Sequence, residues 1–409
     1  MLEDTKTPQI RFKGFNEPWT ETKLGELGEI ITGSTPSTLK PEYYSENGIP
    51  WITPTDINSS TISDSPKKLS VKGAKVGRVV PPNTILCTCI ASIGKNTLLT
   101  VKGSFNQQIN ALIPNTNNDA YFLLAESELW SNKMKLLAAA GTMQIVNKTE
   151  FAEITTMLPT KVEQEKIGNF FASINSFITL NEQKHEKLVQ TKRAMLSKMF
   201  PKAGECVPEL RFKDFTDPWQ QCKFSSIAKL NRGLTYSPSD LVASNTGIRV
   251  LRSSNILEDK FVLHDDDVFV SEKAVNIDFA NEGDILITAA NGSTRLVGKR
   301  AKITNLPTKA VHGGFMLLAK TDDPNFLNAA MGASWYTRFL NIGVSGGNGA
   351  IGNLDKDALS QQELPIPSFE ERQQIGSFFS NLDSLITLAA KKVDVLKNIK
   401  RAMLDKMFV

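Results

Sequence analysis

Two long segments with the same apolar repeat constrain this fold more than any other part of the chain. They lie in residues 158–201 and 364–409, and equivalent positions are 208 residues apart, as Ile167 and Ile375 are. Apolar residues recur at alternating four- and three-residue steps, which predicts two helices that each have an apolar seam. At 1.5 Å per residue, about 40 residues form a rod about 60 Å long, too long to be buried in one globule. We therefore expect the two seams to pack together: Ile167, Phe171, Ile174, Ile178, Leu188, Met195 and Met199 against Ile375, Phe379, Leu382, Ile386, Ala389, Val393, Leu396, Met403 and Met407.

Polar residues interrupt both seams and mark both helix starts. Asn181, His185 and Lys192 occupy seam steps in the first helix, and Lys400 does so in the second. We interpret His185 as a residue that fixes the register of the coiled coil rather than as a ligand. Capping boxes at residues 160–163 (Thr-Lys-Val-Glu) and 368–371 (Ser-Phe-Glu-Glu) predict that a hydroxyl and a carboxylate cap each helix start reciprocally.

The connection between the helices indicates how they run. About 160 residues, enough for a domain, leave the end of the first helix and return to the start of the second. These two ends coincide only if the helices are antiparallel. We therefore predict an α+β fold with two related domains of mixed strands and helices, separated by two long helices in an antiparallel coiled coil with a pseudo-twofold, cyclic arrangement. The predicted boundaries are 1–158, 159–202, 203–364 and 365–409.

The repeat extends into both domains. Residues 8–19 (Pro-Gln-Ile-Arg-Phe-Lys-Gly-Phe-Asn-Glu-Pro-Trp) recur as residues 208–219 with the same Arg-Phe and Pro-Trp pairs. Residues 48–57 have a looser match in residues 247–256, and the strand-like Ile85–Thr88 matches Ile285–Thr288. The loops between these segments differ. A shared frame with different loops is typical of two related binding specificities.

Charge is distributed unevenly within each domain, although the net charge is only +4. No Asp or Glu occurs from Ser65 to Asn118 or from Ile285 to Thr321, and Lys and Arg are frequent in both stretches. One such stretch would fit a solvated, aggregation-blocking strand edge. Two at matching repeat positions favour an anionic ligand, for which DNA is the natural choice. The predicted contact residues are Lys67, Lys68, Lys72, Lys75, Arg78, Lys95, Asn106, Gln107 and Gln108 in the first domain and Arg252, Asn291, Ser293, Thr294, Arg295, Lys299, Arg300 and His312 in the second.

The motifs of common enzymes do not fit this chain. Gly94-Lys95 lacks the rest of a phosphate-binding loop, and Val80–Asn83 is not the signature of an amino-methyltransferase. Four cysteines without a CxxC pair argue against a metal site or a disulfide framework, so we expect no metal and no cofactor. Cys87 and Cys89 are expected to be buried thiols. A polar amino terminus and short apolar runs predict a soluble, cytoplasmic protein that does not enter a membrane.

These motifs together resemble one family. The repeated Pro-x-[Leu/Ile]-Arg-Phe-x-x-Phe-x-x-Pro-Trp opening, the Gly-Ile-Pro-Trp-Ile-Thr-Pro-Thr-Asp-Ile segment, the Pro-Ile-Pro-Ser-Phe-Glu-Glu-Arg-Gln-Gln-Ile lead into the second helix and the Arg-Ala-Met-Leu-x-Lys-Met-Phe ends resemble the specificity subunit of Type I restriction-modification enzymes. The resemblance covers nearly the whole chain. The lead into the first helix, residues 160–166, departs from it because it lacks Pro-Ser-Phe.

The resemblance implies a function that composition alone does not give. The two domains would be target recognition domains that each bind half of a split, asymmetric sequence in double-stranded DNA. The partners would be two modification (methyltransferase) subunits, which methylate adenine, and restriction (motor-nuclease) subunits, while this chain would be non-catalytic. The residues also permit another class of function, a rod-like scaffold with two heads that bind proteins or anionic polymers.

Overall fold

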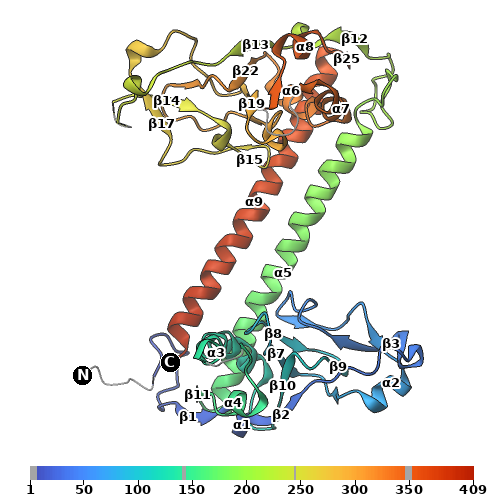
Figure 1. The fold of residues 1–409 in the computed structure, drawn as a ribbon, viewed down its shortest axis with the longest axis vertical. Coiled ribbons are helices and arrows are strands. Elements are labelled where there is room, and N and C mark those ends of the chain that lie inside the picture. Colours follow the sequence, from blue (N-terminus) through green and yellow to red (C-terminus); the bar gives the residue numbers. More distant parts are fainter. Residues whose placement is uncertain (1–6, 141–143, 244–245, 346–351) are drawn as a thin grey trace. The chain divides into compact units, whose positions relative to one another are not determined.

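The computed structural model of this chain describes residues 7–140, 144–243, 246–345 and 352–409. The chain divides into two compact units. Unit 1 comprises residues 1–184 and 389–409, and unit 2 comprises residues 185–388. The long helices are α5 (Lys161–Lys198) and α9 (Phe369–Met407), so each unit contains one head, the start of one long helix and the end of the other (Figure 1).

The head of unit 1 is built mainly from two larger sheets and a covering helix, with a two-stranded sheet, β1-β11, beside them. Alternation along the strands sends Ile85 and Cys87 toward helix α3 and Leu86 toward a second core shared with the smaller sheet. The sheets have the strand orders β2-β10-β7-β8-β4 and β5-β3-β9-β6. The elements are β1 (Thr20–Lys23), α1 (Leu24–Leu27), β2 (Gly28–Thr32), η1 (Pro41–Tyr43), β3 (Tyr44–Ile52), β4 (Thr61–Ile62), β5 (Lys68–Leu69), α2 (Val71–Val76), β6 (Val79–Val80), β7 (Thr84–Thr88), β8 (Asn96–Leu99), β9 (Gly103–Phe105), β10 (Ile109–Pro114), α3 (Ala120–Ala140), α4 (Lys148–Ala152) and β11 (Thr155–Leu158).

The head of unit 2 repeats this plan with shorter helices. Ile285 and Ile287 face the core under α6 and α7, and Leu286 faces a separate core. The main sheets have the orders β13-β22-β18-β20 and β17-β14-β21. The elements are β12 (Gln220–Lys223), η2 (Phe224–Ser226), β13 (Lys229–Arg232), η3 (Pro238–Asp240), β14 (Ile248–Leu251), η4 (Ser253–Asn255), β15 (Ile256–Leu257), β16 (Lys260–Phe261), β17 (Val268–Val270), η5 (Glu272–Ala274), β18 (Ile285–Thr288), β19 (Ala290–Asn291), η6 (Thr294–Leu296), β20 (Arg300–Lys302), β21 (Ala310–His312), β22 (Met316–Lys320), α6 (Pro324–Ala330), α7 (Ser334–Gly343), β23 (Val344–Ser345), β24 (Gly352–Leu354), α8 (Lys356–Gln361) and β25 (Glu363–Ile366).

An arginine from each repeated opening motif forms an ion pair with a glutamate at the start of a long helix. In unit 1 the Arg11 guanidinium donates two hydrogen bonds of 2.7 Å to the Glu163 carboxylate. In unit 2 Arg211 binds Glu371 in the same way, at 2.7 and 2.8 Å. Both carboxylates are fully buried. The repeated motif therefore has a structural role in both units.

These ion pairs correct the prediction of reciprocal capping boxes. The hydroxyl half is present at α9, where the Glu371 N–H donates to Ser368 Oγ at 3.3 Å. The carboxylate half is wrong, because Glu163 and Glu371 instead bind arginines, each of which pairs an opposite charge with the carboxylate through two parallel hydrogen bonds. The predicted second helix, 365–409, also begins too early. Pro367 favours extended backbone in the residue before it, so the strand β25 reaches Ile366.

The end of the other long helix closes each head. In unit 1 Phe408 packs edge-on against Trp19, with ring centroids 6.0 Å apart, and in unit 2 Phe200 packs against Trp219 at 5.8 Å. A backbone hydrogen bond accompanies each contact, from Ile10 N to Lys406 O at 2.9 Å and from Leu210 N to Lys198 O at 2.8 Å. The chain therefore uses the same closure twice.

Contacts between the long helices run antiparallel within each unit. In unit 1 Phe171 contacts Phe408, and further along α5 Glu182 pairs with Lys397, which comes earlier in α9. In unit 2 Lys192 pairs with Asp383 and Phe200 contacts Phe379, in the same reversed order. The predicted α+β class, with related heads and antiparallel long helices, is confirmed.

Most of the predicted seam is buried. Among its residues, Leu188, Met195, Leu396 and Met403 are only half-buried. His185 is also half-buried, and Lys192 binds Asp383 Oδ1 at 2.5 Å. Leu404, outside the predicted seam, is buried against the head of unit 1. The seam is apolar near the heads and becomes polar where side chains reach solvent.

A buried acid in α3 gives unit 1 a pH-dependent stability. Glu126 accepts a hydrogen bond from Thr156 Oγ1, which in turn accepts one from Trp130 Nε1 at 3.1 Å. Burial raises the pKa of the Glu126 carboxyl to about 8. Between about pH 4.5, where the unfolded chain releases this proton, and about pH 8, only the folded chain retains it. Stability should therefore fall as the pH rises.

In this window the free energy of unfolding of the wild type should fall by up to about 1.4 kcal/mol per pH unit. We predict that Glu126→Gln abolishes this contribution to the pH dependence. The measurement is the free energy of unfolding in urea at pH 5 to 8, for the wild type and the variant. Glu21→Gln, which changes an exposed carboxylate in β1, is the control and should keep the wild-type slope. Equal slopes for wild type and Glu126→Gln would contradict the buried proton.

The contacts at the carboxyl terminus also predict a tolerated circular permutation. A chain that begins at Ala203 and joins Val409 to Thr7 through a short linker should fold, because Ile10 already bonds to Lys406 in unit 1. Thermal unfolding should stay cooperative, with a Tm close to that of the wild type. A permutant opened between Leu286 and Ile287, inside the buried strand β18, should aggregate. Aggregation of both permutants alike would contradict the cyclic arrangement.

Candidate nucleic-acid interface

One parallel strand pair in unit 1, β3 with β9, corresponds to a parallel pair in unit 2, β14 with β21. In unit 1 Ile52 of β3 lies opposite Phe105 of β9, and in unit 2 Leu251 of β14 lies opposite His312 of β21. The residue after each second strand donates a backbone hydrogen bond of 2.9 Å to the first strand, from Asn106 N to Ile52 O and from Gly313 N to Leu251 O. Parallel strands end at the same edge of a sheet, so the segments that follow them meet there.

A glycine-led loop joins this edge in each head. Gly33 follows β2 and Gly233 follows β13, and a Cβ on either would lie about 2 Å from a carbonyl oxygen, of Asn106 or of Gly313 respectively. Only glycine permits this approach. The next residue donates to the second parallel strand, Ser34 N to Phe105 O at 3.0 Å and Leu234 N to His312 O at 2.7 Å. This loop is not among the sites predicted from the sequence, although the two glycines 200 residues apart are a signal for it.

The loop brings polar side chains to the turn Asn106-Gln107-Gln108 in unit 1. Thr35 Oγ1 donates to Gln107 Oε1 at 2.5 Å. Asn106 Nδ2 donates to Gln108 Oε1 at 3.0 Å, and Asn106 itself is buried. Arg78 joins this group through a backbone hydrogen bond to Ser34 Oγ at 3.0 Å, and its side chain is exposed. Gln107 and Arg78 are therefore predicted contact residues that can reach a ligand at this edge.

The equivalent edge of unit 2 has different side chains. Arg252 follows β14, and Asn291 Nδ2 donates to Ser253 Oγ at 3.3 Å. The turn after β21 is Gly313-Gly314-Phe315, in place of Asn-Gln-Gln. Ser293, Thr294 and Arg295 are exposed just beyond Asn291. Both heads share the same strand frame, but the side chains at this edge differ between them.

The structure places two predicted contact residues inside the head of unit 2. His312 is 1% exposed, its Nε2 lies 3.1 Å from Asn231 O, and burial lowers its pKa, so it favours the neutral form. Arg300 is buried against Tyr336, donates to Asn328 O at 3.3 Å and pairs with Asp259 at 3.6 Å. Their internal partners keep both side chains from the surface, so we leave them out of the proposed interface.

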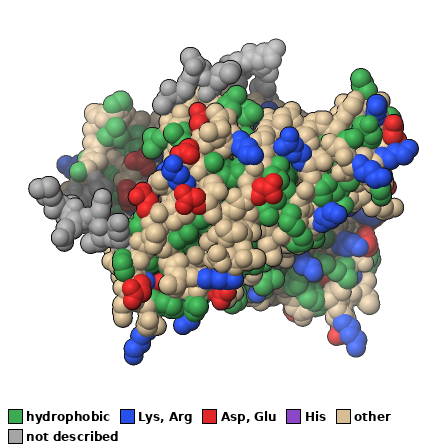
Figure 2. All heavy atoms as spheres, turned by 90° about the horizontal axis from the view of Figure 1, so that it is seen from below, with side chains coloured by type: hydrophobic (Ala, Val, Ile, Leu, Met, Phe, Trp, Pro, Cys, Tyr) green, Lys and Arg blue, Asp and Glu red, His purple; other side chains and the backbone are tan. Residues whose placement is uncertain are grey.

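The acid-free stretches behave differently in the two units. Within the acid-free stretch of unit 1, Lys68 alone among the described residues forms an ion pair, with Asp64 at 2.9 Å. The side chains of Lys67, Lys72, Lys75, Arg78 and Lys95 are exposed. Figure 2, which looks onto unit 1, shows Lys and Arg side chains scattered over this face among apolar, neutral and acidic ones. In unit 2 acids from outside the stretch fold onto it: Lys309 lies 4.0 Å from Glu272, and Lys320 lies 3.3 Å from Asp278. Lys299 is half-buried, and Arg295 is exposed.

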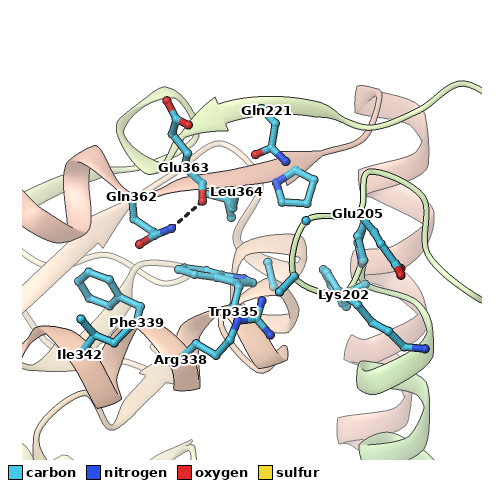
Figure 3. Close-up of a pocket in the computed structure, with 16 residues that line it drawn as sticks. Lys202, Glu205, Gln221, Trp335, Arg338, Phe339, Ile342, Gln362, Glu363 and Leu364 are labelled. Carbon is cyan, nitrogen blue, oxygen red and sulfur yellow. Dashed lines mark hydrogen bonds between the residues drawn. The ribbon is translucent and has the colours of Figure 1, made fainter.

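Two other features carry no recognition chemistry. Cys87 and Cys89 are both buried, as predicted, and burial raises the pKa of the Cys89 thiol to about 11, so it is a poor nucleophile. A hollow of about 460 Å³ in unit 2 is lined by Phe200, Trp335 and Phe339, among others (Figure 3). None of the predicted contact residues is among the described residues that line it. We assign it no ligand.

The chain thus contains two related heads with one strand frame and different turns, and comparison with known proteins gives its family. The family described as the Type I restriction modification DNA specificity domain matches residues 16–190 and 216–398. The chain is 24% identical over 416 residues to the MjaIX specificity subunit of Methanocaldococcus jannaschii, covering 95% of this chain and 92% of that protein. It is 23% identical over 423 residues to the EcoKI specificity subunit of Escherichia coli, covering 96% and 89%.

Solved structures show the same fold. The Type I restriction-modification S subunit from M. genitalium matches with a TM-score of 0.60 at 14% identity, covering 98% of this chain and 99% of that one. A chain from a structure of type I system assembly and conformational transition matches with a TM-score of 0.50 at 15% identity, covering 95% and 97%. The chain belongs to the Type I restriction-modification DNA specificity family, and its role is DNA recognition rather than catalysis. The predicted family and the predicted role in DNA-sequence specificity are confirmed.

None of the helices in the described part of the chain contains an apolar stretch suited to crossing a bilayer.

At the edge of the unit 1 head, phosphate contacts and base contacts should be separable by mutation. We predict that Arg78→Ala weakens binding to all duplexes and lowers the slope of log K against log salt by about 0.9, the value for one lost phosphate contact. Gln107→Ala should instead relax the preference for base pairs of one half-site. Lys102→Ala is the control, because Lys102 precedes β9 and lies at the opposite end of that strand from Asn106. Binding by all three variants that equals wild type would remove this edge from the interface.

Proposed function

We propose that this chain binds a bipartite, asymmetric DNA sequence, with one half-site for each head, and directs adenine methylation or cleavage by partner subunits. Two modification subunits and the restriction subunits would supply the chemistry, in the cytoplasm where the host DNA lies. The paired helices would set the spacer between the half-sites. The observation that carries the proposal is the pair of matching edges at the ends of β3–β9 and β14–β21.

The groups at these edges fit duplex DNA. Glutamine and asparagine amides hydrogen-bond the exposed edges of bases in the major groove, and arginine binds either a phosphate or guanine. The unit 1 edge presents Gln107 beside Arg78, and the unit 2 edge presents Asn291 beside Arg252. Different side chains on one frame would give two different half-sites, which makes the combined site asymmetric.

A binding selection tests this function directly. The chain, with and without its co-purified partners, would be mixed with a pool of random duplexes, and bound DNA would be sequenced at several salt concentrations. We expect two short conserved elements separated by a fixed, unconserved spacer, and an affinity that falls steeply with salt. An unselected pool, or binding that ignores salt, would instead favour the scaffold function.

The long helices also present a repeated surface for two partner subunits. Phe177 and Leu180 of α5 in unit 1 are 56% and 59% exposed, and the positions 208 residues later, Leu385 and Leu388 of α9 in unit 2, are 48% and 64% exposed. Residues three apart lie on one face of a helix, so each pair forms one apolar patch. Exposed apolar groups that recur at equivalent positions favour two equivalent docking sites. We propose that each patch binds one modification subunit.

We predict that Phe177→Ser with Leu180→Ser reduces the bound modification subunits from two to one, and that adding Leu385→Ser and Leu388→Ser removes the second. Native mass spectrometry of the co-purified complexes gives the stoichiometry. Ile342→Ser, at a highly exposed residue of α7 that belongs to neither patch, is the control and should keep two subunits. Two subunits retained by the fourfold variant would place the docking surface elsewhere.

A further inference from the structure

The turn between β21 and β22 in unit 2 presents an aromatic ring to solvent. Phe315 is 68% exposed, whereas the equivalent residue of unit 1, Gln108, is half-buried and bonded to Asn106. The equivalence follows from the backbone. Cys89 N donates to Gln108 O at 2.8 Å, and Ala289 N donates to Phe315 O at 2.9 Å.

Hydrogen bonds fix the backbone of Phe315, whereas its ring is exposed to solvent. Its carbonyl oxygen accepts hydrogen bonds from Ala289 N at 2.9 Å and from Ala290 N at 3.0 Å, and Met316 N bonds to Gly313 O across the turn at 2.8 Å. Gly313 and Gly314 precede the ring and have no side chains, so the backbone of this turn can approach a ligand closely. A fixed backbone with a projecting ring is preorganised for contact.

The neighbours of this turn are the polar groups of the proposed interface. A Cβ placed on Gly313 would lie 3.9 Å from Arg252 Cγ, and one on Gly314 would lie 3.5 Å from Thr235 Oγ1. Asn291 follows directly after Ala290, whose N–H bonds to Phe315. Phe315 is therefore a large apolar group at an edge that is otherwise polar and basic.

We propose that Phe315 contacts the 5-methyl group of a thymine in the half-site bound by the second head. This inference rests on the proposed function. The corresponding turn of the first head carries amides suited to the major groove, and in that groove the thymine methyl is the apolar feature that a side chain can contact. The first head has glutamine at this position and reads no methyl group through it. Phe315 is thus a specificity-determining residue of the second head alone.

Uracil substitution tests this contact, because it removes only the methyl group. Once the recognised sequence is known, each thymine of both half-sites is replaced singly by uracil in duplexes bound by the full chain with its partners. At one thymine the wild type should lose about fourfold in affinity, the effect of one buried methyl group. Phe315→Ala should bind the thymine duplex more weakly and show no further loss with uracil at that position. Phe315→Leu, which keeps an apolar contact, should remain sensitive.

Control variants separate this inference from the function on which it rests. Phe369→Ala, at another exposed phenylalanine outside the edge, should respond to uracil as the wild type does. A uracil penalty that is unchanged in Phe315→Ala, or absent at every thymine in the wild type, would overturn the methyl contact. Altered half-site preference in Gln107→Ala would show in that case that the proposed DNA recognition still holds. Wild-type protein that selects no sequence would overturn both.

Discussion

The buried ion pair between each opening motif and a long helix is the interaction on which both units depend. Arg11 and Glu163 are 152 residues apart in the chain, and Arg211 and Glu371 are 160 apart, yet both pairs bond through two short hydrogen bonds. The carboxylates have no access to solvent. Loss of either arginine would leave an unpaired buried charge, at a cost of about 3–5 kcal/mol.

This ion pair acts together with the aromatic closure at the other helix. Trp19 of unit 1 packs on Phe408, and Trp219 of unit 2 packs on Phe200, so each head needs the start of one long helix and the end of the other. Two heads closed in the same way can hold the same strand frame while their turns diverge. Stability therefore depends on the repeated residues. The residues proposed for recognition, such as Gln107 and Phe315, lie in turns that differ between the heads.

The repeat made the architecture predictable from the sequence. The spacing of the apolar seams and the domain-length connection were sufficient to predict antiparallel helices, because few other arrangements bury two long apolar stripes. The partner of Glu163 was not predictable, because its arginine lies 152 residues away and a local cap also satisfied the pattern. Long-range pairing of this kind leaves no periodic signal.

The interface was only partly predictable for a related reason. Charge counted along the chain selected Arg78, which is exposed, but it also selected Arg300, which the fold buries and pairs with Asp259. Acids distant in sequence fold onto the basic stretch of unit 2, so its sequence charge overstates its surface charge. The roles of the glycine-led loops and of Phe315 were not predicted, because close backbone approach and side-chain exposure depend on the three-dimensional packing.

We propose that two separately closed heads each bind one half of a split DNA sequence. Genome-wide mapping of methylated adenines, in a cell that carries this chain and its partner subunits, tests this proposal. We expect one bipartite motif, with two different half-sites, a methylated adenine in each and a spacer of fixed length and free sequence. A single uninterrupted motif, or two identical half-sites, would contradict it.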